Sequence, residues 1–264
     1  MKRNEIPLNL EEAIIISNLK LAKNIWRLTM SAPKVSSQYQ GPGQFISLLL
    51  NDGWEHPIRR PMSIARVDEN HIDILYKIFG NVTKELSLKR KGDHLNILGP
   101  LGNYFSDYKG ENTVLIGGGV GLAPILNLYD TCPDSTLIIG AGTAEEHFFE
   151  HDPERNIYLT TDNGSIGIHG TVLNALKRVN LEKHFIIYAC GPEPMLEAIQ
   201  QFACENRIKA QLSVESYMGC GTGLCQGCVI QRGIVEEKKH SYHEKYSLVC
   251  KNGPVFWSDE VIFG

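Results

Sequence analysis

The stretch Thr113-Val-Leu-Ile-Gly-Gly-Gly-Val-Gly-Leu-Ala-Pro124 marks the point at which the pattern of the 264-residue chain changes. Its first four residues form a short apolar run, and four of the next five residues are glycines. A glycine-rich turn between a strand and a helix lets backbone N–H groups approach a phosphate. The order G-G-G-x-G-x-x-P differs from the usual dinucleotide fingerprint, so the stretch by itself fits either a nucleotide site or a structural turn.

After this stretch, short apolar segments alternate with helical ones. Residues 136–139, 156–160 and 184–189 are predicted strands separated by helical stretches. Alternation of this kind predicts a parallel sheet in an α/β domain. We expect this central domain to span residues 108–213.

Before the glycine-rich stretch, the chain consists mainly of strand patterns. Residues 13–17, 24–30 and 44–50 are predicted strands, and residues 71–78 alternate between apolar and polar side chains with a period of two. Several short strands at this spacing predict a small antiparallel β-barrel. We expect residues 8–107 to form it.

The C-terminal segment, residues 214–264, contains four clustered cysteines. Cys220, Cys225, Cys228 and Cys250 have the spacing C-x4-C-x2-C-x21-C, which begins like the plant-type [2Fe–2S] ligand pattern. Thiolates also bind structural zinc, but zinc sites usually use paired knuckles, and here one pair alone is closely spaced. A [2Fe–2S] cluster is the favoured interpretation, with zinc or no metal as alternatives. The segment is too short to form a hydrophobic core of its own without a bound metal group to hold it together. We expect it to form a small C-terminal subdomain.

The composition excludes several functional classes. Hydrophobic residues make up 42% and charged residues 21% of the chain, as in ordinary globular proteins. The formal net charge of −4 gives no general affinity for nucleic acid or for an anionic membrane. The chain has no signal-peptide pattern at its N-terminus and no run near the ~18 apolar residues of a membrane helix. We expect a cytoplasmic protein, where thiols stay reduced and free for metal binding.

A second motif, Ala189-Cys-Gly-Pro-Glu-Pro-Met195, follows a predicted strand and begins a helix. Together with the glycine-rich stretch, it resembles the ferredoxin–NADP reductase superfamily. The resemblance implies that the first motif receives the phosphates of a pyridine nucleotide and that the second lines the nicotinamide. The residues that it assigns to NAD are Gly117, Gly118, Gly119, Gly121, Cys190, Gly191 and Pro192.

Glu145 and Glu146 follow the predicted strand 136–139, near the position expected for a nucleotide ribose. The segment lacks the arginine that a 2′-phosphate would require, which favours NAD over NADP.

The segment Arg59-Arg-Pro-Met-Ser-Ile64 resembles the R-x-Y-S/T flavin motif of the same superfamily, in the form R-P-x-S. A guanidinium group can bind a flavin pyrophosphate through two hydrogen bonds, and the Ser63 hydroxyl can approach the flavin N5 edge. Two further segments match in order and spacing, although Val82 stands where the superfamily usually has glycine. The residues that the resemblance assigns to FAD are Arg60, Pro61, Met62, Ser63, Leu75, Tyr76, Lys77, Val82 and Thr83.

The cysteine-bearing tail resembles the electron-transfer subunits of class 1B, NAD-dependent dihydroorotate dehydrogenases. Val214-Glu-Ser-Tyr-Met-Gly-Cys220 and the ending Leu248-Val-Cys-Lys-Asn-Gly-Pro-Val-Phe256 carry this resemblance, which covers nearly the whole chain in one order of motifs. It implies that Cys220, Cys225 and the two later cysteines hold the cluster. The chain departs from the family in a long charged loop over residues 231–247 and in Tyr217, where the family often has arginine.

The resemblance implies a function in electron transfer, with no residue assigned to catalysis. A separate FMN-containing dihydroorotate dehydrogenase subunit would pass electrons through the [2Fe–2S] cluster and FAD to NAD+ in pyrimidine biosynthesis, in a heterotetramer with two copies of each chain. Two alternatives stay open. One is an electron-transfer subunit of another NAD(P)H-dependent complex, of the ferredoxin:NADP or sulfide dehydrogenase type. The other is a nucleotide-binding redox sensor whose cysteines hold zinc.

Overall fold

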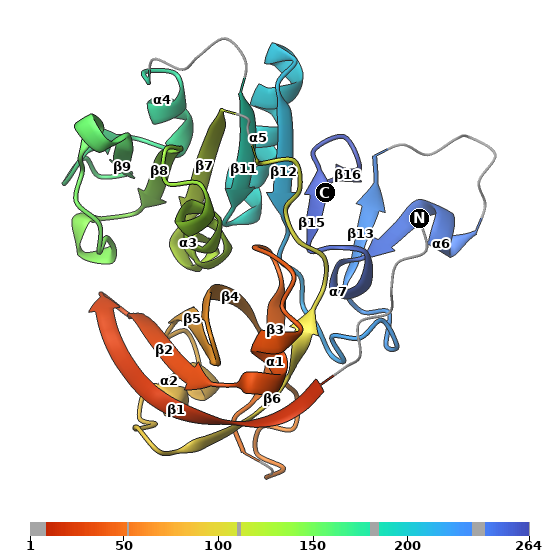
Figure 1. The fold of residues 1–264 in the computed structure, drawn as a ribbon. Coiled ribbons are helices and arrows are strands. Elements are labelled where there is room, and N and C mark those ends of the chain that lie inside the picture. Colours follow the sequence, from red (N-terminus) through yellow and green to blue (C-terminus); the bar gives the residue numbers. More distant parts are fainter. Residues whose placement is uncertain (1–8, 52, 110–111, 180–184, 234–240, 264) are drawn as a thin grey trace.

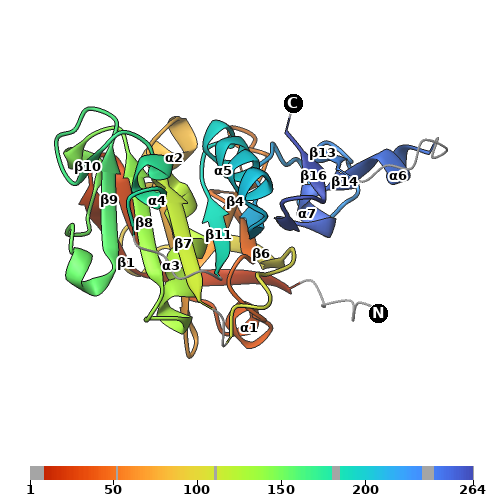
Figure 2. The ribbon, with the colours of Figure 1, turned by 90° about the horizontal axis from the view of Figure 1, so that it is seen from above.

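The computed structural model describes residues 9–51, 53–109, 112–179, 185–233 and 241–263. Within these ranges the chain forms three sheets: a barrel, a larger sheet above it and a small sheet at one side (Figure 1). A view from above shows the small sheet projecting beyond the other two (Figure 2). The expected combination of a barrel, a mainly parallel sheet and a small C-terminal part is confirmed.

The barrel is closed and has the strand order β1-β2-β5-β4-β3-β6. Among the described residues, all pairings between its strands are antiparallel. Its interior is filled by alternating side chains such as Leu28, Ile46 and Ile74, which are fully buried. The elements of the barrel are β1 (Asn9–Ala22), β2 (Ile25–Ser31), α1 (Pro33–Ser37), β3 (Phe45–Leu49), β4 (Arg60–Asp68), β5 (His71–Lys77), α2 (Asn81–Leu86) and β6 (His94–Leu101).

The central sheet has the order β10-β9-β8-β7-β11-β12-β15, and all its pairings are parallel except that of β12 with β15. Its strands are β7 (Thr113–Gly118), β8 (Thr136–Ala141), β9 (Ile157–Thr161), β10 (Ile168–His169), β11 (Ile186–Cys190), β12 (Lys209–Ser213) and β15 (Val255–Trp257). The connections contain α3 (Leu122–Thr131), α4 (Val172–Leu176), α5 (Glu193–Asn206) and the short turns η1 (Gly119–Gly121), η2 (Ala144–Glu146) and η3 (Pro153–Arg155).

Helices cover both faces of this sheet, as its nearly continuous apolar strands require. Residues such as Leu115 and Leu137 pack with α3 on one face, whereas Val114 and Ile138 pack with α4 and α5 on the other. Helix α3 also contacts the barrel, because the Asn127 amide donates to the Ile64 carbonyl over 3.0 Å. The central sheet is therefore seated on the barrel through α3.

The C-terminal part of the chain contributes to two sheets. The small sheet has the order β14-β13-β16, made of β13 (Val229–Arg232), β14 (Tyr246–Leu248) and β16 (Val261–Ile262), with α6 (Tyr242–Lys245) and α7 (Val249–Asn252) beside it. The remaining C-terminal strand, β15, pairs with β12 and forms the edge of the central sheet. None of the helices in the described ranges is long and apolar enough to cross a membrane.

One side chain joins the barrel to this tail. The Asn103 amide nitrogen donates to the carbonyls of Asn252 (3.2 Å) and Val255 (2.7 Å), and the amide oxygen accepts from the Val255 N–H (2.9 Å). We expect Asn103→Ala to lower the free energy of unfolding by about 3 kcal/mol, because it leaves three partly buried backbone groups without partners.

Urea unfolding followed by circular dichroism would measure this loss. Asn206→Ala is the matched control, since Asn206 makes one hydrogen bond from an exposed position to the Phe202 carbonyl. An equal effect of both substitutions would contradict the role of Asn103 as the link.

Candidate functional site

A cavity of about 360 Å³ lies where the barrel, the central sheet and the cysteine-bearing segment meet. The barrel contributes seven of the residues predicted to bind FAD: Pro61, Met62, Ser63, Leu75, Tyr76, Lys77 and Thr83. The turn η1 contributes Val120, and the tail contributes Glu215, Met218 and Pro254. The structure thus brings three distant parts of the sequence to one cavity.

The lining of this cavity suits a flavin ring. Met62, Leu75 and Val120 supply apolar surface for the flat faces of an isoalloxazine, and the Ser63 hydroxyl is available to its polar edge. The exposed ring of Phe79 also lines the cavity, where an aromatic ligand can pack against it. The residues present therefore fit the flavin that the sequence predicts.

The two neighbouring arginines have different surroundings. The guanidinium of Arg59 donates to the carbonyls of Ser47 and Asn96, each over 3.1 Å, and thereby joins β3 to β6. Arg60 donates to the Ile58 carbonyl through one nitrogen over 2.6 Å, and its remaining N–H groups can reach a phosphate. Arg60 is thus the member of the pair that suits an anionic cofactor.

Two predicted FAD residues, Val82 and Tyr76, make side-chain contacts inside the barrel. Val82 is buried and packs into the core of the barrel, so its backbone is the part that can meet a ligand. The Tyr76 hydroxyl donates to Asn18 over 2.9 Å, and burial raises the pKa of Tyr76 to about 12. Tyr76 is therefore part of the cavity wall and anchored to the barrel by its hydroxyl, whereas the Val82 side chain supports the wall from behind.

The glycine-rich turn packs directly against the second motif. A Cβ atom at Gly121 would lie 2.6 Å from the Cys190 carbonyl oxygen and 2.5 Å from the Gly191 nitrogen. A Cβ at Gly118 would lie 2.7 Å from the Met195 sulfur. Gly119 has a φ of +56° and faces open space, where a phosphate can approach the backbone. The two predicted nucleotide motifs therefore form one surface.

Two titratable groups lie where this surface meets the cavity. Complete burial raises the pKa of the Cys190 thiol, with a further contribution from Glu215 that outweighs the hydrogen bond from Ser213. Loss of hydration likewise raises the pKa of the Glu215 carboxyl. Cys190 therefore stays a neutral thiol, and Glu215 binds a proton more readily than an ordinary carboxylate.

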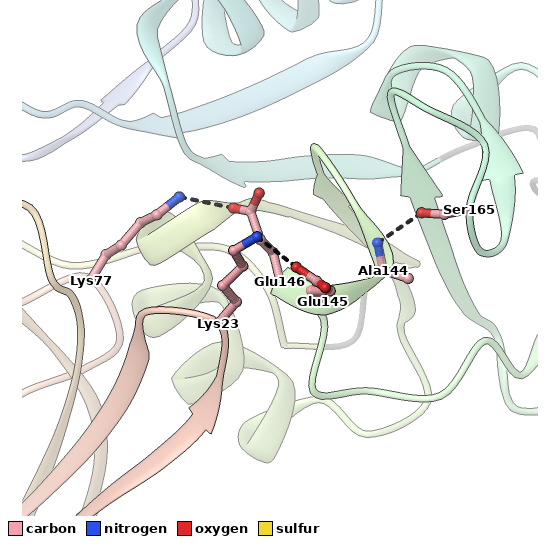
Figure 3. A network of polar contacts seen from close by, with 6 residues as sticks. All are labelled: Lys23, Lys77, Ala144, Glu145, Glu146 and Ser165. Atoms are coloured by element: carbon pink, nitrogen blue, oxygen red, sulfur yellow. Dashed lines mark hydrogen bonds and ion pairs between the residues drawn. The ribbon is translucent and has the colours of Figure 1, made fainter.

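Ion pairs connect the barrel to the turn η2 (Figure 3). Lys23 Nζ lies 2.6 Å from a Glu145 carboxylate oxygen, and Lys77 Nζ lies 2.8 Å from one of Glu146. The Lys23 backbone N–H also donates to the Glu145 carbonyl over 2.8 Å. The hydrogen bond and charge of Lys23 lower the pKa of Glu145. The two glutamates expected near a ribose thus face lysines of the barrel, and Lys77 links the cavity to the central sheet.

The four predicted metal ligands are arranged in two pairs. The Cys225 N–H donates to the Cys220 sulfur over 3.3 Å, and the Cys250 N–H donates to the Cys228 sulfur over 3.4 Å. A two-iron cluster requires two thiolates for each iron together with N–H donors to sulfur, so the donor set fits a [2Fe–2S] cluster.

The two pairs differ in their surroundings. Burial opposes ionisation of Cys220, but backbone N–H groups of Cys225 and Thr222 outweigh it and lower the pKa of Cys220 to about 6. Burial, followed by the neighbouring Cys228, raises the pKa of Cys250 to about 12. Cys228 and Cys250 are 1% and 3% exposed, whereas Cys225 is exposed. The site therefore has a buried inner side and an open outer side.

Val120, Glu215 and Met218 are among the residues of the cavity wall that sequence reasoning did not identify. Each belongs to a stretch that the motifs do contain, but no local pattern shows that its side chain faces a flavin. Their role becomes visible only when the barrel and the tail are placed side by side.

Comparison with known proteins agrees with this arrangement. Residues 215–262 match a family model described as the iron-sulfur cluster binding domain of dihydroorotate dehydrogenase B. The chain is 35% identical over 254 residues to the dihydroorotate dehydrogenase B (NAD(+)) electron transfer subunit of Caldanaerobacter subterraneus subsp. tengcongensis, covering 96% of this chain and 98% of that protein. It is 32% identical over 268 residues to the subunit of the same name from Fusobacterium nucleatum subsp. nucleatum, covering 96% and 99%.

Solved structures share the fold. A structure of an NADH-dependent reduced ferredoxin-NADP oxidoreductase superposes with a TM-score of 0.80 at 27% identity and covers 96% of this chain and 90% of that chain. The ferredoxin reductase of carbazole 1,9a-dioxygenase gives a TM-score of 0.65 at 20% identity, over 78% of this chain and 68% of that one, which shows a common fold.

We expect Gly121→Ala to weaken NAD(H) binding about tenfold or more, because the new methyl group forces the two nucleotide motifs apart. Titration of the holoprotein with NADH, followed by flavin absorbance, would measure the change. FAD content is the internal control, since Gly121 does not line the cavity. Unchanged NADH affinity would contradict the assignment of this turn to the nucleotide.

Proposed function

Since this chain belongs to the family of dihydroorotate dehydrogenase B electron-transfer subunits, we propose that it passes electrons from an FMN-containing catalytic subunit, through a [2Fe–2S] cluster and FAD, to NAD+. The observation that carries this proposal is the cavity shared by three segments. Val120 of the nucleotide turn and Met218, two residues before Cys220, line the same cavity as the predicted flavin residues. A flavin there would contact the segments that hold both of its redox partners.

Bound FAD supplies the exchange between a two-electron hydride and single electrons, which links the nicotinamide to the cluster. The chain's own residues bind and orient the groups that take part. Arg60 would offer guanidinium N–H groups to the flavin phosphates, and the Ser63 hydroxyl on the cavity wall would hydrogen-bond the ring edge. The predicted assignments of Arg60, Ser63 and their neighbours to FAD are part of this proposal.

Two groups with raised pKa values lie beside the proposed nucleotide site. Cys190 remains a neutral thiol at the end of β11, packed where Gly121 allows close approach. The Glu215 carboxyl, with its raised pKa, can hold a proton at the wall of the cavity. We propose that these residues form the side of the cavity at which the nicotinamide would meet the flavin.

The cysteines are proposed to ligate the cluster in the two pairs that the backbone already joins. Cys220 and Cys225 lie on the open side, and Cys228 and Cys250 on the buried side. The match of residues 215–262 to an iron-sulfur cluster binding domain favours this over zinc. We further propose a cytoplasmic location, two copies of each subunit in the complex, and NAD rather than NADP as acceptor, as in the names of the relatives.

A second candidate is an electron-transfer subunit that serves ferredoxin and NADP. The superposition with an NADH-dependent reduced ferredoxin-NADP oxidoreductase favours it. The higher identity to dihydroorotate dehydrogenase subunits, 35% against 27%, places it second.

Purification of the chain with a co-expressed dihydroorotate dehydrogenase catalytic subunit tests the proposed function. We expect oxidation of dihydroorotate to produce one NADH for each orotate, with NADP a poorer acceptor. Reduction of ferredoxin without any reaction with dihydroorotate would favour the second candidate.

The substitution Cys225→Ser should separate the two halves of the electron path. We expect loss of cluster absorbance and of dihydroorotate-dependent NAD reduction, while NADH still reduces a two-electron dye through FAD. Cys204→Ser is the matched control, because Cys204 is exposed and belongs to no motif. Loss of both activities in Cys225→Ser would instead show that the cluster is needed to hold the fold together.

A further inference from the structure

Lys77 brings a positive charge to the cavity proposed for the flavin. Among the described residues that line this cavity, Lys77 carries the one cationic side chain. A charge at the wall of a cofactor cavity acts on the electronic state of the cofactor as well as on its binding. A group that holds and neutralises the Lys77 ammonium therefore also affects a flavin bound there.

That group is the carboxylate of Glu146. Lys77 Nζ lies 2.8 Å from a Glu146 carboxylate oxygen, although the two residues are 69 positions apart in the chain. Their side chains are 40% and 23% exposed, so solvent screens the two charges incompletely. The ammonium at the cavity wall is thus paired with an anion from the central sheet domain.

The surroundings of Glu146 fix the position of its carboxylate. A Cβ atom at Gly142 would lie 3.2 Å from the carboxylate oxygen that does not contact Lys77. The Ala144 N–H donates to the Ser165 hydroxyl over 2.8 Å, which ties η2 to the connection between β9 and β10 (Figure 3). The Glu146 carboxylate is therefore enclosed between Gly142 and Lys77.

The neighbouring ion pair provides an internal comparison. Glu145 precedes Glu146 in η2, and its carboxylate lies 2.6 Å from Lys23 Nζ (Figure 3). Lys23 is not among the described residues that line the cavity, and the Lys23 and Glu145 side chains are 59% and 67% exposed. Both pairs join the barrel to η2, but the pair of Lys77 alone ends at the cavity.

Reduction changes the charge of a flavin. Uptake of two electrons and one proton leaves the ring system with one negative charge, whereas the oxidised ring is neutral. A lone ammonium at the cavity wall would favour the reduced form and raise the reduction potential, and a carboxylate paired with that ammonium opposes this effect. A flavin that passes electrons to NAD+ needs a low potential, because NAD+ is a weak oxidant.

We propose that Glu146 is a positioning residue that lowers the reduction potential of the flavin by holding and neutralising the Lys77 ammonium, and so favours electron transfer to NAD+. The inference rests on the proposed function, since it concerns the flavin of the same cavity. It gives Glu146 a role other than the contact with a nucleotide ribose that its place after β8 suggests.

The test compares Glu146→Gln with Glu145→Gln in the full-length holoprotein, by anaerobic redox titration of the flavin absorbance against a dye of known potential. We expect Glu146→Gln to shift the equilibrium about tenfold toward reduced FAD at low ionic strength, which is a rise of about 30 mV for a two-electron couple. Glu145→Gln is the matched control and should leave the potential unchanged, because Lys23 does not line the cavity.

Removal of the cation should have the opposite effect. We expect Lys77→Gln to lower the potential, and the double variant Lys77→Gln/Glu146→Gln to return close to the wild-type value, because the two charges act as a pair. Glu146→Asp keeps the charge and should keep the wild-type potential. A purely structural role of Glu146 would not produce opposite shifts that cancel. If Glu146→Gln does not fold, the fall in potential of Lys77→Gln and its reversal in the double variant decide the matter.

The outcomes separate this inference from the proposed function. Equal potentials of the wild-type protein, Glu146→Gln and Lys77→Gln would overturn the inference, and a wild-type complex that couples dihydroorotate to NAD would leave the function intact. Equal shifts in Glu146→Gln and Glu145→Gln would also overturn it, because they would assign the effect to the surface charge of η2. Opposite shifts in a holoprotein that does not react with dihydroorotate would overturn the proposed function alone. Absence of FAD from the purified wild-type protein would overturn both.

Discussion

The pairing of β15 with β12 is the constraint on which the arrangement of the molecule depends. Ser213, at the end of a parallel strand, pairs with Val255, which follows the last cysteine by five residues. The tail must therefore return to the central sheet after Cys250, and Asn103 of the barrel holds it there through three hydrogen bonds. This return brings Met218 and Pro254 into the wall of the cavity proposed for the flavin, so a cluster held by the tail would lie near that cavity.

The same return creates the asymmetry of the cysteine site. Cys228 and Cys250 are buried in an apolar cluster, where an isolated thiolate is costly, and the pKa of Cys250 is raised to about 12 accordingly. Cys220 lies at the outer side, where backbone N–H groups overcome partial burial and lower its pKa to about 6. Metal binding would deprotonate Cys250 and release a proton, which couples cluster insertion to the folding of the tail.

The barrel and the central sheet are held together in two ways. The packing of α3 on the barrel, with the Asn127 amide bound to the Ile64 carbonyl, is buried and supplies the firm contact. The ion pairs from Lys23 and Lys77 to η2 are partly or largely exposed, so they contribute little to stability. Their effect is to orient η2 beside the cavity, next to the surface where the nucleotide motifs meet.

Local patterns in the sequence determined the order of domains and the chemistry of the site. Period-two strands and a glycine turn between a strand and a helix depend on neighbouring residues, so the barrel and the parallel sheet could be predicted from sequence alone. The spacing from Cys220 to Cys250 likewise led to the proposal that these cysteines are the cluster ligands.

Tertiary structure decided what each side chain faces. It made Arg59 a structural link and left Arg60 with free donors, turned Val82 into the core, and placed Glu215 at the cavity. It also paired Glu146 with Lys77, 69 residues earlier in the chain. No local pattern contains this information, because the partners are distant in sequence and meet only when the barrel, the sheet and the tail close around one cavity.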